Sequence, residues 1–415
     1  MSMHAPFRRV LPALIVIPAA LAQPAPVRPA GFEPPQAQLT PESLDASVRA
    51  LVGMAEGDAR DQWPYEGVYR VNREIPVGYR IGGTAIVVEA LAQAPGYDAD
   101  EARKAAVERG LGFIIETRAH PLMSEADYDG GYDVRGWGYV HGLHTLARLK
   151  RLGLIPASLG AKADEAARWY ADALQKIEIP GPGGWNYARP AGRKNPGQPS
   201  PFMTGSALRA LFEAKEAGYE IDPEVVERGL SALERSRTDA GSVVYSGVGT
   251  GRVRPTDSTP GAVGRILTVE ATLALAGRSD TARVRGAVDA FIVHWGWLEA
   301  RRAKPGTHEG PYAVAPYYFM FAHHAAAQAV ELLPVAERAE YRRRINNLLG
   351  SVRSEHGTWN DRVFARSSGY GTAMALLAIH APTVKPPSRW TPAPANAPAP
   401  GAGLGGGGGG GAGLP

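Results

Sequence analysis

The chain has 415 residues, a net charge of +4 and no cysteine. Without cysteine, disulfides, cysteine-ligated zinc, iron–sulfur clusters, thioesters and cysteine nucleophiles are all excluded. The basic residues are scattered along the sequence, so the charge offers no footprint for nucleic acid, and we expect no nucleic-acid partner.

Residues 1–22 are typical of a secretory signal peptide. A basic Arg-Arg pair precedes the apolar stretch Val10–Ala19, which is too short to span a bilayer, and an Ala-Leu-Ala triplet ends at Ala22. We therefore expect cleavage before Gln23 and a periplasmic or secreted protein. An uncleaved anchor is the alternative, which the two prolines in the apolar stretch disfavour. No later segment is apolar enough to span a membrane.

Both ends of the remaining chain have the composition of linkers. Residues 23–39 are rich in Pro and Ala, residues 382–400 repeat that bias, and residues 401–415 are almost all glycine. Such segments bury too little apolar surface to offset the entropy cost of ordering. The sequence therefore predicts a folded region over 40–381, with a linker at 23–39 and a disordered tail over 382–415.

Two kinds of helix alternate across the folded region. One kind carries a charged face, which is typical of a surface helix, and the other is rich in Ala, Gly and Leu, which is typical of a buried helix. The charged helices are expected at Pro41–Gly57, Asp100–Arg118, Ala161–Ile177, Pro223–Arg237, Thr281–Trp295 and Glu337–Arg353. The apolar helices are expected at Gly82–Gln93, Tyr139–Leu149, Thr204–Lys215, Gly261–Ala276, Tyr318–Leu333 and Gly369–Ala381.

This alternation predicts an all-α (α/α)6 toroid of six helical hairpins, with the apolar helices in an inner ring. A small residue or histidine recurs near the start of each apolar helix, at Gly83, Gly142, Gly205, Gly264, His323 and Gly371. Such self-similarity is typical of stacked supersecondary units. An open solenoid is the structural alternative. The long loops all follow charged helices, so they should emerge on one face, where function usually resides.

The long loops share a glycine–tryptophan motif. It is clearest in Gly183-Gly184-Trp185-Asn186-Tyr187 and in Gly357-Thr358-Trp359-Asn360-Asp361. Glycine permits a tight turn, after which the aromatic ring can wedge between hairpins. The pattern resembles the repeat of the squalene–hopene cyclase and prenyltransferase superfamily over residues 40–381. The resemblance implies the toroid fold and, as one ligand class, an apolar or isoprenoid molecule.

The catalytic residues of that superfamily are missing. The segment most like the protonating Asp-x-Asp-Asp motif of the cyclases is Asp127–Asp133. Three interpretations of this segment remain open: a displaced protonation site, a Ca²⁺ loop or a polar turn. The prenyltransferase zinc site requires cysteine. His141 and His144, with a histidine from a neighbouring helix, could ligate a metal, but we favour polar lining of the ring. We predict no metal and no cofactor.

The candidate site lies at the mouth of the ring on the loop face. The starts of the inner helices share this opening, and their dipoles favour anionic or hydroxyl-rich ligands. We expect the candidate catalytic residues to approach one another across the mouth: His141, Asp257 and His323. Expected ligand-binding residues are Trp137, Tyr139, Trp185, Tyr317, His324, Trp359 and Tyr370.

Three functional classes remain open. The missing catalytic sets favour a non-catalytic binding or scaffold protein of the cell envelope, holding an apolar, isoprenoid or glycan ligand at the mouth. The alternative is an enzyme that uses Asp and His of the loop face, either a terpenoid cyclase-like isomerase or a carbohydrate hydrolase or lyase of the α/α-barrel type. A protein–protein module that docks through its loops is the third class. Fold alone decides none of these.

Overall fold

A computed structural model describes residues 39–126, 134–187, 197–249 and 254–391. These residues all belong to one compact unit, Pro34–Pro415. Their regular structure is helical, with twelve α-helices, several short 3-10 turns and only isolated β-bridges in the described ranges. The Asp127–Asp133 segment lies outside the described residues, so its proposed cation or protonation role stays a prediction.

The predicted alternation of helices is confirmed. The outer helices are α1 (Pro41–Gly53), α3 (Glu101–Thr117), α5 (Gly160–Lys176), α7 (Pro223–Ser236), α9 (Thr281–Arg301) and α11 (Val335–Ser351). The inner helices are α2 (Val77–Gln93), α4 (Arg135–Leu152), α6 (Pro201–Glu216), α8 (Thr259–Leu275), α10 (Tyr318–Val330) and α12 (Ser368–His380).

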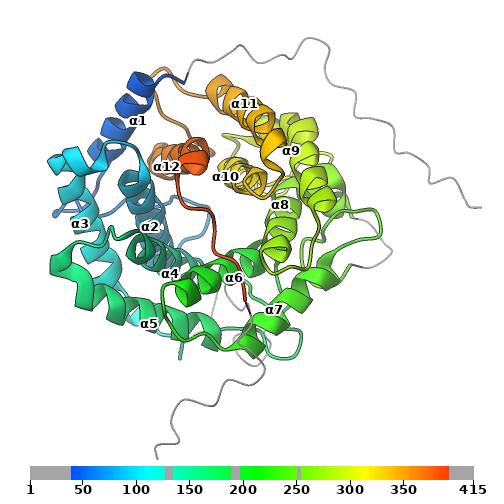
Figure 1. The fold of residues 1–415 in the computed structure, drawn as a ribbon, viewed down its shortest axis with the longest axis horizontal. Coiled ribbons are helices and arrows are strands. Elements are labelled where there is room, and N and C mark those ends of the chain that lie inside the picture. The colour runs from blue at the N-terminus through cyan, green and yellow to red at the C-terminus, as the bar shows by residue number, and fades with distance from the viewer. Residues whose placement is uncertain (1–38, 127–133, 188–196, 250–253, 392–415) are drawn as a thin grey trace, which may run out of the picture. The chain divides into compact units, whose positions relative to one another are not determined.

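The inner helices close into a ring. Each contacts the next in chain order, and α12 packs against α2, so the last hairpin meets the first. Figure 1 shows this arrangement, with the outer helices surrounding the inner ones. The (α/α)6 toroid is therefore confirmed, and the open solenoid is wrong. None of the described helices is both long enough and apolar enough to cross a bilayer.

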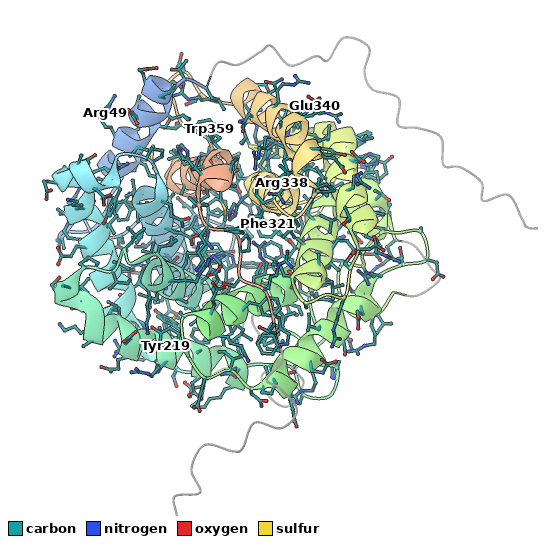
Figure 2. The ribbon with its side chains drawn as sticks, viewed as in Figure 1. Arg49, Tyr219, Phe321, Arg338, Glu340 and Trp359 are labelled. Atoms are coloured by element: carbon teal, nitrogen blue, oxygen red, sulfur yellow. The ribbon has the colours of Figure 1, made fainter. Side chains whose placement is uncertain are left out.

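Burial explains which helices lie inside. Helix α2 is buried on almost every face, whereas α11 buries only Ile345, Leu348 and Leu349. A helix that is apolar all round gains most by burial on all sides, and a helix with a charged face can bury only the other face. In Figure 2, Phe321 of α10 lies near the ring axis, while Arg49 and Glu340 lie on outer helices.

Three wedge tryptophans hold outer helices to inner ones in the same way. Each indole N–H donates a hydrogen bond of 2.8 Å to a backbone carbonyl of the preceding outer helix: Trp63 to Leu51, Trp185 to Leu174, and Trp359 to Leu349. Each tryptophan backbone N–H donates to a threonine hydroxyl near the start of the next inner helix: Thr84 at 2.9 Å, Thr204 at 3.0 Å and Thr372 at 3.1 Å. These contacts join the two helices of one hairpin. The Trp63 and Trp185 rings also lie beside Gly110 of α3 and Gly229 of α7 in the next hairpin, which fits the predicted wedging between hairpins.

The end of the described chain forms a strap, residues 384–391, across the ring (Figure 1). Arg148 and Arg151 of α4 each donate to the Pro386 carbonyl at 3.1 Å. Trp390 is 7% exposed, stacks on Phe212 of α6, and has its backbone N–H 3.1 Å from the carbonyl of Leu275, the last residue of α8. The strap therefore bridges the ring at the ends of the inner helices.

The prediction of a disordered tail from residue 382 onward is wrong for residues 382–391. Its Pro-rich composition suggested a chain that buries little, but one tryptophan and a few backbone groups find partners on the ring. The lesson is that a proline-rich segment needs only a single large apolar side chain to dock. Residues 392–415 lie outside the described residues.

Candidate functional site

Two cavities lie one behind the other along the ring axis. The mouth pocket is lined by residues of the long loops and of the first turns of the inner helices: Tyr65, Val68, Tyr69, Tyr79, Trp137, Tyr187, Phe202, Thr307, Tyr317, Arg362 and Tyr370. The central chamber lies further along these helices and is lined by Ile86, Glu89, Val140, His141, His144, Ser206, Arg209, Phe321, His324, Ala325, Gln328, Met374 and Leu377.

Two aromatic contacts join the linings of the cavities. The Trp137 ring at the mouth lies 4.5 Å, centroid to centroid, from the His141 ring in the chamber. The Phe202 ring at the mouth lies at the same distance from the Phe321 ring in the chamber. The two cavities are therefore neighbours along the inner helices.

The walls of the mouth pocket are aromatic and carry neutral hydroxyls. Tyr65 packs against Tyr370 with centroids 4.5 Å apart, and against Tyr79 edge-on at 5.2 Å. Burial raises the pKa of all three phenols, so each keeps its proton and can donate a hydrogen bond. Arg362 brings a positive charge to the wall, and its Nε donates to the Tyr65 hydroxyl at 3.1 Å.

The repeat register explains which residues face the mouth. Tyr65 and Tyr187 each stand two residues after a wedge tryptophan, and both line the mouth pocket. In the sixth hairpin the same position holds Asp361. The turn that the wedge tryptophan fixes therefore directs a carboxyl group toward the mouth in place of a phenol.

Asp361 is a fully buried carboxyl group behind the pocket wall. Neither of its oxygens has a hydrogen bond of normal geometry within the described residues. Burial raises its pKa to about 7, although Arg362 and the Tyr65 hydroxyl partly counter that effect. A carboxyl with this pKa still holds its proton near neutral pH, which is the state a general acid requires.

The central chamber is polar. Glu89 faces it and interacts with the Gln93 amide at 2.9 Å, the Thr145 hydroxyl at 3.3 Å and His144 Nε2 at 3.6 Å. Burial opposes ionisation of Glu89, but His144, Arg148 and other basic groups outweigh it and hold its pKa well below the usual range. Glu89 is therefore an anion at any physiological pH.

Five of the predicted site residues line the two cavities. Trp137, Tyr317 and Tyr370 lie in the mouth pocket, and His141 and His324 lie in the central chamber. Burial lowers the pKa of both histidines to about 3, so they are neutral. Nearby, His144 is the only other histidine on the chamber wall among the described residues.

Three predicted ligand-binding residues line neither cavity. Trp185 and Trp359 are wedge tryptophans, with indoles buried between helices. Tyr139 is also fully buried, and its hydroxyl donates to the Met123 carbonyl at 2.5 Å. Their expected place on the mouth wall is wrong, because their polar atoms are used in the packing of the ring.

The predicted meeting of His141, Asp257 and His323 is also wrong. His323 accepts a hydrogen bond from Trp295 Nε1 at 2.8 Å, so it faces outer helix α9 instead of the axis. Its Nδ1–H donates to the Phe319 carbonyl at 2.8 Å, and burial lowers its pKa to about 4. Both ring nitrogens are thus satisfied within the protein, as in a structural core histidine.

Asp257 has a structural role in the loop before α8. Its carboxylate accepts from the Tyr245 backbone N–H and from Arg254 Nε, both at 2.7 Å, and from the Thr256 hydroxyl at 3.1 Å. Burial opposes its ionisation, but these donors outweigh burial and lower its pKa. Within the described residues, no three His, Asp or Glu side chains are grouped closely enough to hold a metal ion.

The sequence reasoning missed Asp361, Arg362, Tyr65, Glu89 and Arg209. Superposing the repeats on their tryptophans would have found the first of these, because Asp361 follows Trp359 as Tyr65 follows Trp63. The sequence offers no comparable signal for Glu89 and Arg209. They belong to apolar inner helices, and only the closed ring shows that they face the axis.

Comparison with known proteins shows the fold. No protein-family model and no curated protein sequence matches this chain. Among solved structures, the unsaturated glucuronyl hydrolase from Bacillus sp. GL1 is 14% identical, with a TM-score of 0.51 over 81% of this chain and 94% of that chain. An inactive variant of the alpha-1,6-mannanase GH76A of Salegentibacter sp. HEL1_6, in complex with alpha-1,6-mannotetrose, is 12% identical, with a TM-score of 0.53 over 81% and 98%.

These neighbours correct the expectation of a non-catalytic binding or scaffold protein. That expectation rested on the missing residues of cyclases and prenyltransferases, but the α/α toroids with this fold include hydrolases of carbohydrates. A toroid without those residues is therefore no sign of a non-catalytic protein. Membership of the squalene–hopene cyclase and prenyltransferase superfamily in particular stays a prediction.

Proposed function

We propose that this chain is an exported carbohydrate-active enzyme that binds a glycan in the mouth pocket and uses Asp361 as its general acid. The carrying observation is the position of Asp361, a buried carboxyl with a pKa of about 7 directly behind an aromatic pocket. Glycosidic bond cleavage needs an acid that is protonated near neutral pH to protonate the leaving oxygen. The leader-like sequence at residues 1–22 supports export.

The mouth pocket suits a sugar for physical reasons. Sugar rings present C–H faces that pack on aromatic planes, and hydroxyl edges that exchange hydrogen bonds with phenols and guanidinium groups. The pocket offers both, in Trp137, Tyr65, Tyr370 and Arg362. The hydrolases with a similar ring, among them the mannanase in complex with a mannotetrose, lend support to a glycan over an isoprenoid ligand.

Tyr65 connects the acid to the pocket. It lines the mouth pocket, and Asp361 influences its pKa directly, whereas the Asp361 carboxyl is itself fully buried. In the proposed step, the Tyr65 hydroxyl passes its proton to the glycosidic oxygen while Asp361 replaces it, and the glycosidic C–O bond breaks. Water then adds to the anomeric carbon, and the proton that it releases returns to Asp361. The Arg362 guanidinium, which donates to the same hydroxyl at 3.1 Å, stabilises the carboxylate that remains on Asp361.

The test compares three variants on one panel of substrates. The panel holds alpha-1,6-mannotetraose and an oligosaccharide that ends in an unsaturated glucuronyl residue, with product release followed by chromatography. Asp361→Asn and Tyr65→Phe should each lower kcat by roughly 10²–10⁴-fold on the sugar that is cleaved, while Tyr69→Phe, a second phenol of the same pocket, should retain most of it. In the parent, kcat should fall above pH 7 as Asp361 loses its proton.

Two results would overturn the proposal. The first is a parent enzyme, purified in full length from its own envelope, that neither cleaves nor binds any oligosaccharide of the panel. The second is an Asp361→Asn variant with the activity and pH profile of the parent. An isoprenoid retained by the parent, with no sugar bound, would point to the other ligand class that the sequence predicts.

A further inference from the structure

The central chamber holds a positive charge that forms no ion pair with a carboxylate in the described residues, although Glu213 and Glu89 act on it at longer range. Arg209 on α6 is only 9% exposed, and its Nη2 donates to the Gln328 side-chain oxygen. Its Nε is buried and has no hydrogen-bond partner. Of the nearby carboxylates in the described residues, Glu213 is paired with Arg148 and Arg151 instead. A buried guanidinium group with an N–H that makes no hydrogen bond costs free energy, so a ligand that accepts a hydrogen bond there would be stabilising.

The surroundings of Arg209 are arranged to donate hydrogen bonds. His141 and His324 line the same chamber, and no hydrogen bond within the described residues uses their ring nitrogens. Since burial keeps both rings neutral, each has one N–H to give. The one carboxylate on the chamber wall, Glu89, already has Gln93, Thr145 and His144 around it.

The chamber has room for a small ligand group. Its volume is about 50 Å³, which is room for roughly three water molecules. A single carboxylate group fits into that space. A carboxylate is also the planar acceptor that matches the geometry of a guanidinium group.

We infer that the central chamber is a carboxylate-binding site, in which Arg209 donates through its free Nε–H and a neutral histidine, His141 or His324, donates a second hydrogen bond. The carboxylate has two chemical sources. It is a small free acid such as acetate, or it is the carboxyl group of an acidic sugar whose ring remains in the mouth pocket. Only the acidic sugar depends on the proposed function. If it is the source, the substrates of the proposed enzyme are glycans that contain uronic acids.

The test uses the full-length protein and two carboxylates with matched controls. Acetate and glucuronate are titrated by calorimetry and by thermal shift, against chloride and glucose at equal concentration and constant ionic strength. The parent should be stabilised by a carboxylate and not by chloride. Arg209→Met should weaken carboxylate binding at least tenfold, and Arg343→Met, on the exposed side of α11, should leave it unchanged.

The pattern of responses identifies the source. A response to acetate alone assigns a small free acid, and a response to glucuronate alone, or to glucuronate much more than to acetate, assigns an acidic sugar. Equal responses to chloride and acetate, or no response to either carboxylate, would overturn the assignment. Asp361→Asn should still bind acetate, so a failed glycosidase test and a failed carboxylate test remain separate results.

A second readout distinguishes a ligand-binding arginine from a structural one. Without added carboxylate, Arg209→Met should be at least as stable as the parent, because it removes an unpaired buried charge from the chamber. If Arg209→Met unfolds more easily than the parent, the guanidinium is a structural cation and the inference is wrong. Arg209→Lys serves as the conservative variant: it keeps the charge but lacks the Nε–H, so it should bind acetate about tenfold more weakly.

Discussion

At the loop end of the ring, aromatic side chains surround the mouth pocket, and the carboxyl oxygens of Asp361 lie behind them without a hydrogen bond of normal geometry in the described residues. At the other end, the strap crosses the ring, and the buried carboxylate of Glu213 pairs with Arg148 and Arg151 and accepts from the Ser388 backbone N–H. The Glu213 carboxylate is thus fully paired and adds stability. The Asp361 carboxyl is left without such partners, which costs stability and is typical of functional sites.

The largest expected effect lies at the strap end. Glu213 is almost fully buried, so Glu213→Gln leaves the buried guanidinium group of Arg148 without its ion-pair partner, while Arg151 keeps only its pair with Glu216. We expect a loss of about 3–5 kcal/mol in the free energy of unfolding, measured by urea denaturation. The control is Glu340→Gln, since Glu340 pairs with Arg343 on the exposed surface of α11 and should show no measurable loss. An equal loss of stability in the two variants would contradict the view that the buried ion pairs at the strap end stabilise the fold.

The second prediction concerns Asp361 and pH. Its folded-state pKa of about 7 lies above its ordinary value of 3.8, so between these values the folded state binds a proton that the unfolded chain has lost. The stability of the parent should therefore fall as pH rises from about 4 to 7, and Asp361→Asn should not show this fall. The difference should grow to roughly 4 kcal/mol above pH 7, measured by urea denaturation at several pH values.

Asp257 supplies the matched control for this pH dependence, with the opposite sign. Its pKa is lowered in the folded state, so its contribution to stability is present above its unfolded pKa and is lost as pH falls through the folded pKa. Asp257→Asn should therefore destabilise the protein at neutral pH, with a difference that shrinks in acid. If both variants changed the pH profile in the same direction, Asp361 would not be a protonated buried acid.

The third prediction removes the strap. A chain ending at Thr383 loses the buried Trp390 ring and exposes Phe212, whereas a chain ending at Thr391 keeps both. We expect the shorter chain to lose about 2 kcal/mol or more, seen as a lower melting temperature. The longer chain should match the full-length protein, because residues 392–415 have the composition of a disordered tail. A similar melting temperature for all three chains would show that the strap contributes nothing.

The smallest expected effect tests a wedge at the mouth end. A Cβ atom added at Gly371 would lie 2.5 Å from the Trp359 carbonyl oxygen, a backbone atom that cannot move away cheaply. Gly371→Ala should therefore cost about 1–3 kcal/mol in the free energy of unfolding. Gly112→Ala is the control within outer helix α3, where a Cβ meets nothing within 4 Å, and it should stabilise by up to about 1 kcal/mol. Two stabilised variants would refute the close contact between α12 and the turn at Trp359.

The fold was accessible from the sequence, and the site only in part. The alternation of charged and apolar helices predicts the two rings, because the distribution of charged residues around a helix determines whether it can be buried on one face or on all faces. His323 and His324 show the limit of this reasoning. They are neighbours on α10, where successive residues point about 100° apart. One meets Trp295 on the outer ring and the other faces the axis, and the sequence alone did not fix the rotation of the helix.

Asp361 was missed for a different reason. Its sequence context was in view as part of a turn motif, but its chemistry depends on burial, which raises its pKa, and on the tyrosines that the closed ring brings beside it. Burial of a loop residue is a property of the assembled ring and has no local signature. The repeat register recovers its direction but not its protonation state.

The strap crosses the ring at the end opposite the mouth. Under the proposed function, a glycan that enters at the mouth would meet the strap at the far end and could not continue through the ring. We would then expect cleavage near chain termini more than at the interior bonds of a long polysaccharide. Opening the strap end, as in a chain that stops at Thr383, would be the way to ask whether that topology sets the size of the products.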